Sequence, residues 1–297
     1  MSSSSTPGAP AALACYRHPD RYTYVRCQRC GRAICGECQT PAPVGVICPE
    51  CMRQQRANAP RTKPAILTRF TGPGKPVVTY VIIAVCVIVF IAQWITGLGS
   101  GPVTSNLLYA GIFGYPSGEV VQTSSGAILA SFEPWRMITA AFVHANLLHI
   151  ALNMYTLWIF GIVLEPMLGR VRYALLFVIS AIAGSVGVYL LDSPAQGVVG
   201  ASGAIFGMMA ALLIIQRHIG GPIRQLLVLV GINLVISFLP GFGIAWQAHV
   251  GGLVGGAIVG LIYMQTRQRS RRPLQIILIA ALVVVLVVVG NWHAIIG

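Results

Sequence analysis

Charged residues are scarce in this 297-residue chain, and acidic ones are the scarcest. They make up only 9% of the residues, with seven Asp and Glu against 20 Lys and Arg. A soluble globular protein carries about 25% charged residues, so the composition excludes an ordinary soluble enzyme. Hydrophobic residues reach 56%, which also excludes a disordered chain and is typical of a membrane protein. The formal net charge of +13 would suggest a nucleic-acid partner if the protein were soluble.

Long uncharged stretches begin at Val77 and continue to the end of the sequence. A bilayer core requires roughly 20 apolar residues per helix, and Pro240-Gly241-Phe242-Gly243 divides the longest stretch into two. The sequence therefore predicts seven transmembrane helices, and the fifth is the shortest. The stretches are Val77–Leu98, Met137–Leu164, Tyr173–Leu191, Val198–Gln216, the two parts of Gln225–Thr266 on either side of the break, and Leu274–Gly297.

The basic residues indicate the orientation of these helices. With the N-terminus in the cytoplasm, 19 of the 20 Lys and Arg residues lie on the cytoplasmic side, and Arg136 alone lies outside. Cytoplasmic loops of membrane proteins are enriched in these residues. We therefore expect a multi-pass protein in the plasma membrane of a bacterium, with a cytoplasmic N-terminus and an exterior C-terminus. The positive net charge then needs no nucleic-acid partner.

Composition also predicts the domain boundaries. Residues 1–14 consist largely of Ser, Pro, Gly and Ala without periodicity and are expected to form a disordered tail. Residues 15–56 contain seven of the eight cysteines and form a predicted metal-binding module, and 57–76 is interpreted as a linker. The membrane core is expected over 77–266, and 267–297 adds a C-terminal helix.

Four pairs of metal ligands occur in the predicted module. They are Cys15-x2-His18, Cys27-x2-Cys30, Cys35-x2-Cys38 and Cys48-x2-Cys51. Eight donors can hold two tetrahedral Zn²⁺ ions, and because no ligand position remains open for water, the metals are expected to be structural. A disulfide framework is the alternative, but thiols stay reduced in the cytoplasm. The eighth cysteine, Cys86, lies within the first apolar stretch and is interpreted as a core residue.

The spacing of these pairs resembles that of the B-box and related cross-brace zinc fingers. The resemblance implies that Cys15, His18, Cys35 and Cys38 share one zinc, and that Cys27, Cys30, Cys48 and Cys51 share the other. Sequential pairing remains open. The seven arginines of 15–56 face three acidic residues, but seven thiolates and two Zn²⁺ ions leave the module almost neutral. A neutral module is a poor phosphate binder, which favours a cytoplasmic protein partner over nucleic acid.

Polar residues are rare within the predicted membrane helices, which makes them functional candidates. The second helix contains His144, His149 and Asn153, the fourth begins with Gly200-Ala201-Ser202-Gly203, and the sixth begins near Trp246-Gln247-Ala248-His249. All three helices run from outside to inside in the expected topology. These residues therefore lie towards the outer ends of their helices, with Ser202 and His249 at similar depth.

A serine beside a histidine can act as a nucleophile with its base. Imidazole accepts a proton near neutral pH and so activates the weak hydroxyl nucleophile. The N–H groups that begin the fourth helix, and the His149 and Asn153 side chains on one face of the second, could stabilise an oxyanion. Each feature also has a plainer interpretation. A serine among small residues often serves packing, a membrane histidine often forms an interhelical hydrogen bond or a proton relay, and Gly252-x3-Gly256, like Gly251-x3-Gly255, is a close-packing face.

Together these residues resemble the rhomboid family of intramembrane serine proteases, over roughly Val77 to Thr266. The matching elements are Trp135-Arg136 ahead of the second helix, His144-x4-His149-x3-Asn153 within it, Glu165 and Gly169 after it, Gly200-Ala201-Ser202-Gly203, and Ala248-His249-x2-Gly252-x3-Gly256. The resemblance implies an all-α polytopic fold with a six-helix core, to which this chain adds a seventh helix. It also implies a Ser202–His249 dyad without a catalytic Asp, an oxyanion hole from the Ser202 N–H, His149 and Asn153, and a membrane-embedded first loop over 99–132.

These features favour a serine endopeptidase that hydrolyses peptide bonds in or next to transmembrane segments of other membrane proteins, near the outer face and without a catalytic cofactor. One alternative is an inactive relative that binds membrane clients, which the presence of both Ser202 and His249 disfavours. A second is a transporter with histidine proton relays, but no inverted repeat is visible. A third is a zinc module with a membrane anchor, for which seven helices are more than needed.

Overall fold

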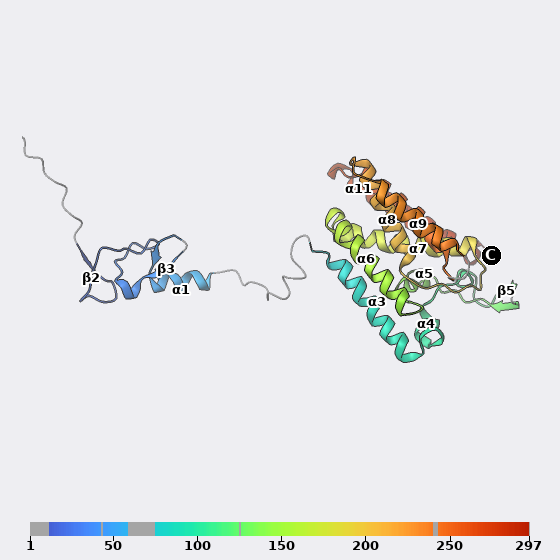
Figure 1. Ribbon diagram of the computed structural model, residues 1–297, viewed down its shortest axis with the longest axis horizontal. Helices are drawn as coiled ribbons and strands as arrows, with labels where there is room; N and C mark the ends of the chain where they lie inside the picture. Colours follow the sequence, from blue (N-terminus) through green and yellow to red (C-terminus); the bar gives the residue numbers. More distant parts are fainter. Residues whose placement is uncertain (1–11, 43, 59–74, 125, 240–242, 297) are drawn as a thin grey trace, which may run out of the picture. The chain divides into compact units, whose positions relative to one another are not determined.

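The computed structural model of the protein describes residues 12–42, 44–58, 75–124, 126–239 and 243–296. They belong to two compact units that divide between Ala65 and Ile66 (Figure 1). Most of the tail and of the linker expected from the sequence lies outside the described residues, as does most of the predicted break at 240–243.

The N-terminal unit consists of short elements around a core of cysteines. The elements are β1 (Leu13–Ala14), β2 (Tyr22–Thr23), the 3₁₀ turn η1 (Gly36–Cys38), β3 (Thr40–Pro41), β4 (Val46–Ile47) and α1 (Pro49–Ala57). β1 pairs antiparallel with β2, and β3 pairs antiparallel with β4. The disordered tail was predicted to extend to residue 14, and this boundary is wrong, because Leu13 and Ala14 pair with β2. Apart from the cysteines, Ile34 and Ile47 are the buried apolar residues of this core among those the structure describes. Two such residues are too few to stabilise a fold of this size without a disulfide or a bound metal.

The second unit is mainly helical. Its longer helices are α3 (Val77–Thr96), α6 (Leu147–Leu168), α7 (Arg170–Leu191), α8 (Ser202–His218), α9 (Arg224–Phe238), α10 (Trp246–Gln265) and α11 (Arg272–Gly290). The shorter elements are η2 (Leu98–Ser100), α4 (Pro102–Leu107), η3 (Gly111–Gly114), β5 (Val120–Thr123), β6 (Gly126–Leu129), α5 (Arg136–Thr139), η4 (Ala140–Phe142), η5 (Arg269–Arg271) and α12 (Trp292–Ile296).

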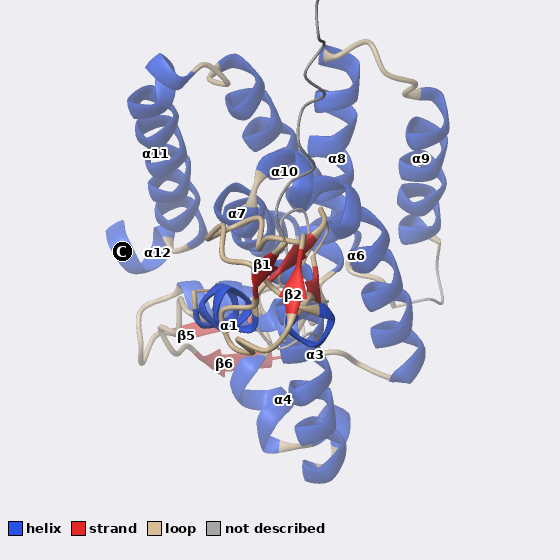
Figure 2. Cartoon of the chain, turned by 90° about the vertical axis from the view of Figure 1, so that its left-hand side faces the viewer, coloured by secondary structure: helices blue, strands red, loops and turns tan. Residues whose placement is uncertain are grey.

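Three helices, α7, α8 and α10, pack against one another at the centre of this unit (Figure 2). α6 contacts α7 and α8, α3 packs on α6, α9 contacts α8 and α10, and α11 packs on α7. The centre is buried, whereas α3, α9 and α11 expose many large apolar side chains. Apolar side chains turned outward on surrounding helices are what a lipid environment favours.

Among the described residues, five helices are long and apolar enough to cross a membrane, namely α3, α6, α7, α10 and the segment Arg269–Gly290 that contains α11. α8 has 17 residues and α9 has 15, and they occupy the places of the predicted fourth and fifth spans. The all-α polytopic fold expected from the sequence is confirmed. All seven apolar stretches contain a long helix.

Three predicted helix boundaries are wrong. The stretch from Met137 does not form one helix, because the chain passes through α5 and η4 before Asn146 caps α6 by accepting a hydrogen bond from the N–H of His149 (2.8 Å). α6 then continues to Leu168, so Glu165 lies inside this helix rather than after it. The last stretch ends its long helix at Gly290, and α12 follows.

The first loop, expected over 99–132, contains regular structure. α4 begins it, η3 follows, and β5 and β6 pair as an antiparallel hairpin from Val120↔Leu129 to Thr123↔Gly126. Tyr109 forms an isolated bridge with Val198, just before the N-terminus of α8. The loop is thus attached to the segment that leads into Ser202.

Candidate active site and metal centres

The start of α8 and the start of α10 bring a serine and a histidine together. Ser202 is the first residue of α8, and His249 lies in the first turn of α10. The Nε2 atom of His249 lies 2.8 Å from the Ser202 Oγ. The Phe206 ring, one turn further along α8, stacks on the imidazole with 4.3 Å between ring centroids. The imidazole is therefore fixed both by its edge and by its face.

Glycine makes this approach of α8 and α10 possible. A Cβ atom at Gly252 would lie 2.0 Å from the carbonyl oxygen of Gly203, and one at Gly256 would lie 2.1 Å from that of Gly207. Real Cβ atoms do not come so close, so any larger residue would push the helices apart. The close-packing face inferred from the glycine spacing thus sets the distance between Ser202 and His249.

A cavity of about 840 Å³ lies where α6, α8 and α10 begin. Its volume falls within the range of ligand pockets. Residues of α6, α7, α8, α9 and α10 and of the segment before α8 line it. Among the sequence-predicted candidates, the lining residues are Ser202, His249, His149, Asn153, Gly200 and Gly203.

His149 lies against the backbone that leads into Ser202. A Cβ atom at Gly200 would lie 2.8 Å from the His149 Nε2, and Gly200 has a φ of +124°, which favours glycine. The N–H of Ala145 donates to the His149 Nδ1 (3.4 Å). Because a neutral imidazole carries one proton, this bond places the proton on Nε2. Nε2 is therefore a hydrogen-bond donor beside Gly200, two residues before Ser202.

Asn153 follows His149 by one turn of α6 and is buried. Its Nδ2 donates to the carbonyl oxygen of His149 (2.8 Å). An amide group has two N–H donors, so one donor remains for a group in the cavity. The histidine and the asparagine thus line the cavity from one face of α6, as their spacing predicts.

His144 is fully buried and lies outside the cavity lining. Its ring centroid is 5.3 Å from that of His149. Gln93 of α3 holds its backbone, because the N–H of His144 donates to Gln93 Oε1 (3.0 Å) and its carbonyl accepts from Gln93 Nε2 (3.1 Å). Sequence reasoning missed Gln93, although a single amide in an apolar helix is a signal.

Arg136 fastens the first loop and does not line the cavity. Its Nε donates to Glu133 (2.6 Å), and its guanidinium donates to the carbonyl oxygens of Ser105 (2.6 Å) and Leu108 (3.2 Å). Burial raises the pKa of the Glu133 carboxyl, but hydrogen bonds from Arg136 and Ser131 outweigh it and hold the pKa below its usual range. Glu133, which sequence reasoning missed, is thus the ionised partner of Arg136.

Trp135 and Glu165 also lie outside the cavity lining. Trp135 is more than half exposed at the start of α5. Glu165 accepts from the N–H groups of Val78 and Thr79, both at 2.8 Å, and from the Thr79 hydroxyl. It therefore satisfies the free N–H groups that begin α3 and joins α3 to α6.

Ser237 of α9 is a further neighbour of the histidine that sequence reasoning missed. Its Oγ lies 2.6 Å from the His249 Nδ1. The available signal was that Asn233 and Ser237 are one turn apart in an otherwise apolar stretch.

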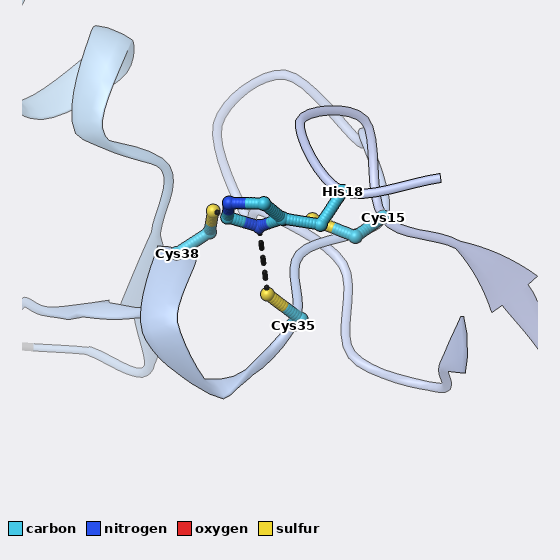
Figure 3. A group of neighbouring side chains, drawn as sticks. All are labelled: Cys15, His18, Cys35 and Cys38. Carbon is cyan, nitrogen blue, oxygen red and sulfur yellow. Dashed lines mark hydrogen bonds between the residues drawn. The ribbon is translucent and has the colours of Figure 1, made fainter. Parts of the chain in front are cut away.

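The N-terminal unit gathers its cysteines and His18 into two groups, each with ligand atoms within 4.8 Å of one another. In the first (Figure 3), the His18 Nδ1 lies 3.3 Å from the Cys35 sulfur, 3.5 Å from that of Cys38 and 3.9 Å from that of Cys15. Four ligands around a tetrahedral Zn²⁺ at about 2.0–2.3 Å lie roughly 3.5 Å apart. The donor set and its spacing therefore fit zinc.

The second group contains Cys27, Cys30, Cys48 and Cys51. The sulfurs of Cys30 and Cys48 are 3.8 Å apart, and the N–H of Cys48 donates to the Cys27 sulfur (3.2 Å). Backbone donors of this kind support sulfur ligands of a metal. The groups combine the first pair with the third and the second with the fourth, which is the cross-brace arrangement and not the sequential one. None of the eight cysteines forms a disulfide, so the disulfide alternative is wrong.

Comparison with known proteins gives a consistent result. The family described as "Rhomboid domain" matches residues 131–266. The "Putative rhomboid protease YdcA" of Bacillus subtilis is 31% identical over 150 residues, which cover 48% of this chain and 73% of that protein. The "Rhomboid protease GluP" of Bacillus subtilis is 31% identical over 220 residues, 71% of this chain and 40% of that protein.

A plant relative is also similar. "RHOMBOID-like protein 6, mitochondrial" of Arabidopsis thaliana is 36% identical over 148 residues, which cover 46% of each chain. The chain thus spans less than half the length of this relative and of GluP. The apolar helices and these matches establish an integral membrane protein.

Proposed function

Since the chain belongs to the rhomboid family, we propose that it is an intramembrane serine endopeptidase. It hydrolyses peptide bonds in or next to transmembrane segments of other membrane proteins. The observation that carries this proposal is the 2.8 Å separation of His249 Nε2 and Ser202 Oγ at the wall of a cavity. Nucleophile and base within hydrogen-bond reach are the requirement for covalent catalysis by serine.

Ser202 is the nucleophile and His249 its base. The Ser202 Oγ attacks the substrate carbonyl carbon while His249 Nε2 takes the hydroxyl proton. His249 then returns this proton to the leaving amine nitrogen as the C–N bond breaks, which leaves an acyl-enzyme. Water attacks the acyl carbon, His249 again accepts and returns a proton, and the acid product leaves Ser202 free.

The negative charge on the carbonyl oxygen needs donors that are already in position. We assign this role to the Ser202 N–H, to His149 through Nε2–H, and to Asn153 through its remaining amide hydrogen. Support comes from the bond of Ala145 to the His149 Nδ1 and from the position of His149 against Gly200. Gly203 and Gly200 keep side-chain bulk away from the reacting bond.

The other candidate residues support this site indirectly. Gly252 and Gly256 hold α10 against α8, and His144 packs beside His149. Arg136 fastens the first loop, and Glu165 joins α3 to α6. Trp135, which is largely exposed at the start of α5, would face the membrane interface, where tryptophan is enriched.

The N-terminal unit, residues 15–56, is proposed as a structural two-zinc module. Cys15, His18, Cys35 and Cys38 would hold one ion and Cys27, Cys30, Cys48 and Cys51 the other, which leaves no position for a reacting water. With the basic residues inside, the module faces the cytoplasm, and its nearly neutral surface suits a protein partner. The cavity residues, at the outer ends of their helices, then face the exterior side. Reporter fusions at both ends of the chain test this topology.

Cleavage of a purified transmembrane substrate by the purified protein tests the proposed function. Wild type should cut the substrate, and Ser202→Ala should not. Asn106→Ala, an exposed change on α4, is the matched control. Equal cleavage by wild type and Ser202→Ala would refute a Ser202-dependent protease, and no cleavage by either would favour the client-binding alternative.

A further inference from the structure

The catalytic histidine has a second hydrogen-bond partner. Ser237 is buried near the end of α9, and its Oγ lies 2.6 Å from the His249 Nδ1. The opposite ring nitrogen, Nε2, faces Ser202 on α8. Two serines from different helices therefore contact the two nitrogens of one imidazole.

The direction of this hydrogen bond follows from the next contact along α9. The Ser237 hydroxyl donates to the carbonyl oxygen of Asn233 (2.7 Å), which can only accept. A hydroxyl has one proton, so the Ser237 Oγ has none left for His249. The Oγ therefore accepts a hydrogen bond from the His249 Nδ1–H.

This direction selects one tautomer of the imidazole. A neutral ring carries a single N–H, and with the proton on Nδ1, Nε2 presents its lone pair to the Ser202 hydroxyl. That is the form in which His249 can accept the proton of Ser202. With the proton on Nε2 instead, the ring would donate to Ser202 and could not act as its base.

We propose that Ser237 is a positioning residue that holds His249 in the base-competent tautomer and stabilises the imidazolium formed during the reaction. This inference rests on the function proposed above. The chain of groups runs from the Asn233 carbonyl through the Ser237 hydroxyl to Nδ1, and it supplies an acceptor where a carboxylate would otherwise stand. When His249 takes the proton from Ser202, the Nδ1–H bond to Ser237 becomes charge-assisted and therefore stronger.

A purely structural role is the rival explanation. Val230 and Ser237 are the buried residues of α9 among those described, so the bond to His249 also ties α9 to α10. Removing it could loosen the helix without any effect on the tautomer. The experiment must therefore measure the protonation of the ring as well as the rate.

The kinetic test compares three substitutions with wild type. Ser237→Ala and Ser237→Val remove the acceptor, whereas Ser237→Thr keeps a hydroxyl and has the shape of valine. The first two should lower kcat about 10- to 100-fold, the factor for one lost buried hydrogen bond, with little change in KM. The threonine variant should stay within about threefold of wild type. Ser180→Ala, which removes a buried hydroxyl on α7 away from the cavity, is the control.

The spectroscopic test uses ¹⁵N-histidine-labelled protein, because the nitrogen signals separate protonated from unprotonated ring positions. Wild-type His249, assigned by comparison with His249→Gln, should carry its proton on Nδ1. In Ser237→Ala, a form protonated on Nε2 should appear. Wild-type kcat in Ser237→Ala, or an unprotonated Nδ1 in wild type, would overturn the proposal.

Two further outcomes separate the possible failures. Equal losses in the threonine and valine variants, with the wild-type tautomer retained in Ser237→Ala, would assign Ser237 a packing role and also overturn the proposal. Full cleavage by Ser202→Ala would instead refute the proposed function. Full activity in Ser237→Ala beside an inactive Ser202→Ala would refute the role of Ser237 alone.

Discussion

His249 Nε2 and Ser202 Oγ lie 2.8 Å apart although 47 residues separate them in the sequence. The contact exists because α8 and α10 cross with glycine against glycine, which lets the two backbones approach. The proposed chemistry of the site therefore depends on helix packing as well as on the Ser202 and His249 side chains.

The serine and the histidine should act as one unit. Ser202→Ala removes the nucleophile and His249→Ala removes its base, so either change alone should reduce cleavage to background. The double variant should be no worse than either single variant, because groups that act in one step are not additive. Initial rates of substrate cleavage measure this. If the rate losses of the two single variants multiplied in the double variant, the result would contradict a dyad.

The two side chains assigned to the oxyanion hole should behave differently from the dyad. Asn153→Ala removes one donor and should lower kcat about 10²- to 10³-fold while leaving measurable activity. His149→Ala should cost at least as much, because this ring also packs against Gly200 beside Ser202. The readout is kcat with a transmembrane substrate. A wild-type rate in Asn153→Ala would remove it from the site.

The glycine contact between α8 and α10 gives a prediction about both stability and activity. Gly252→Ala would place a Cβ atom 2.0 Å from the Gly203 carbonyl oxygen, so the helices must separate and the dyad distance must grow. We expect about 1–3 kcal/mol lower stability and at least a tenfold loss of cleavage, since small misplacements of reacting groups are costly.

Gly231→Ala on α9 is the matched control for this change. A Cβ atom there would contact nothing within 4 Å, and alanine has the higher helix propensity. Thermal unfolding and cleavage should both stay near wild type. If Gly252→Ala were as well tolerated as Gly231→Ala, the packing account of the dyad geometry would be wrong.

Zinc binding should be confined to the N-terminal module. Purified protein should contain about two Zn²⁺ per chain, and Cys35→Ala, or Cys48→Ala, should each lose about one. Cys86→Ser should retain both, because Cys86 lies alone in α3. Metal analysis by mass spectrometry measures this. Full zinc content in Cys35→Ala would contradict the proposed ligand set.

Removal of this module separates its role from catalysis. A chain without residues 1–60 should cleave a minimal substrate at nearly the wild-type rate, because every proposed zinc ligand belongs to the other compact unit. A large loss of rate on deletion or on chelation would show that the module is coupled to the protease.

The sequence predicted the helical fold and the main polar residues of the cavity because both follow local rules. Uncharged stretches of membrane length predict helices, and rare polar residues within them predict a site. The division of the predicted second helix was missed because a hydropathy pattern does not detect helix caps. Here Asn146 caps α6, because its side chain accepts a hydrogen bond from the N–H of His149.

Long-range partners were harder to predict. Gln93 holds His144 across 51 residues, and Ser237 contacts His249 across 12. Each is a single polar residue whose partner depends on how the helices are arranged, which no local pattern specifies. Glu133 was missed for a different reason, because its partner Arg136 was interpreted only as part of a motif.

Covalent labelling of Ser202 tests the central claim most directly. A serine-directed phosphonate reacts with a hydroxyl that an adjacent base has activated. Wild-type protein should gain one adduct, located on the peptide that contains Ser202 by mass spectrometry. Ser202→Ala should stay unlabelled, and His249→Ala should label far more slowly. An adduct on another residue, or equal labelling of wild type and Ser202→Ala, would contradict the account of this protein as a serine protease.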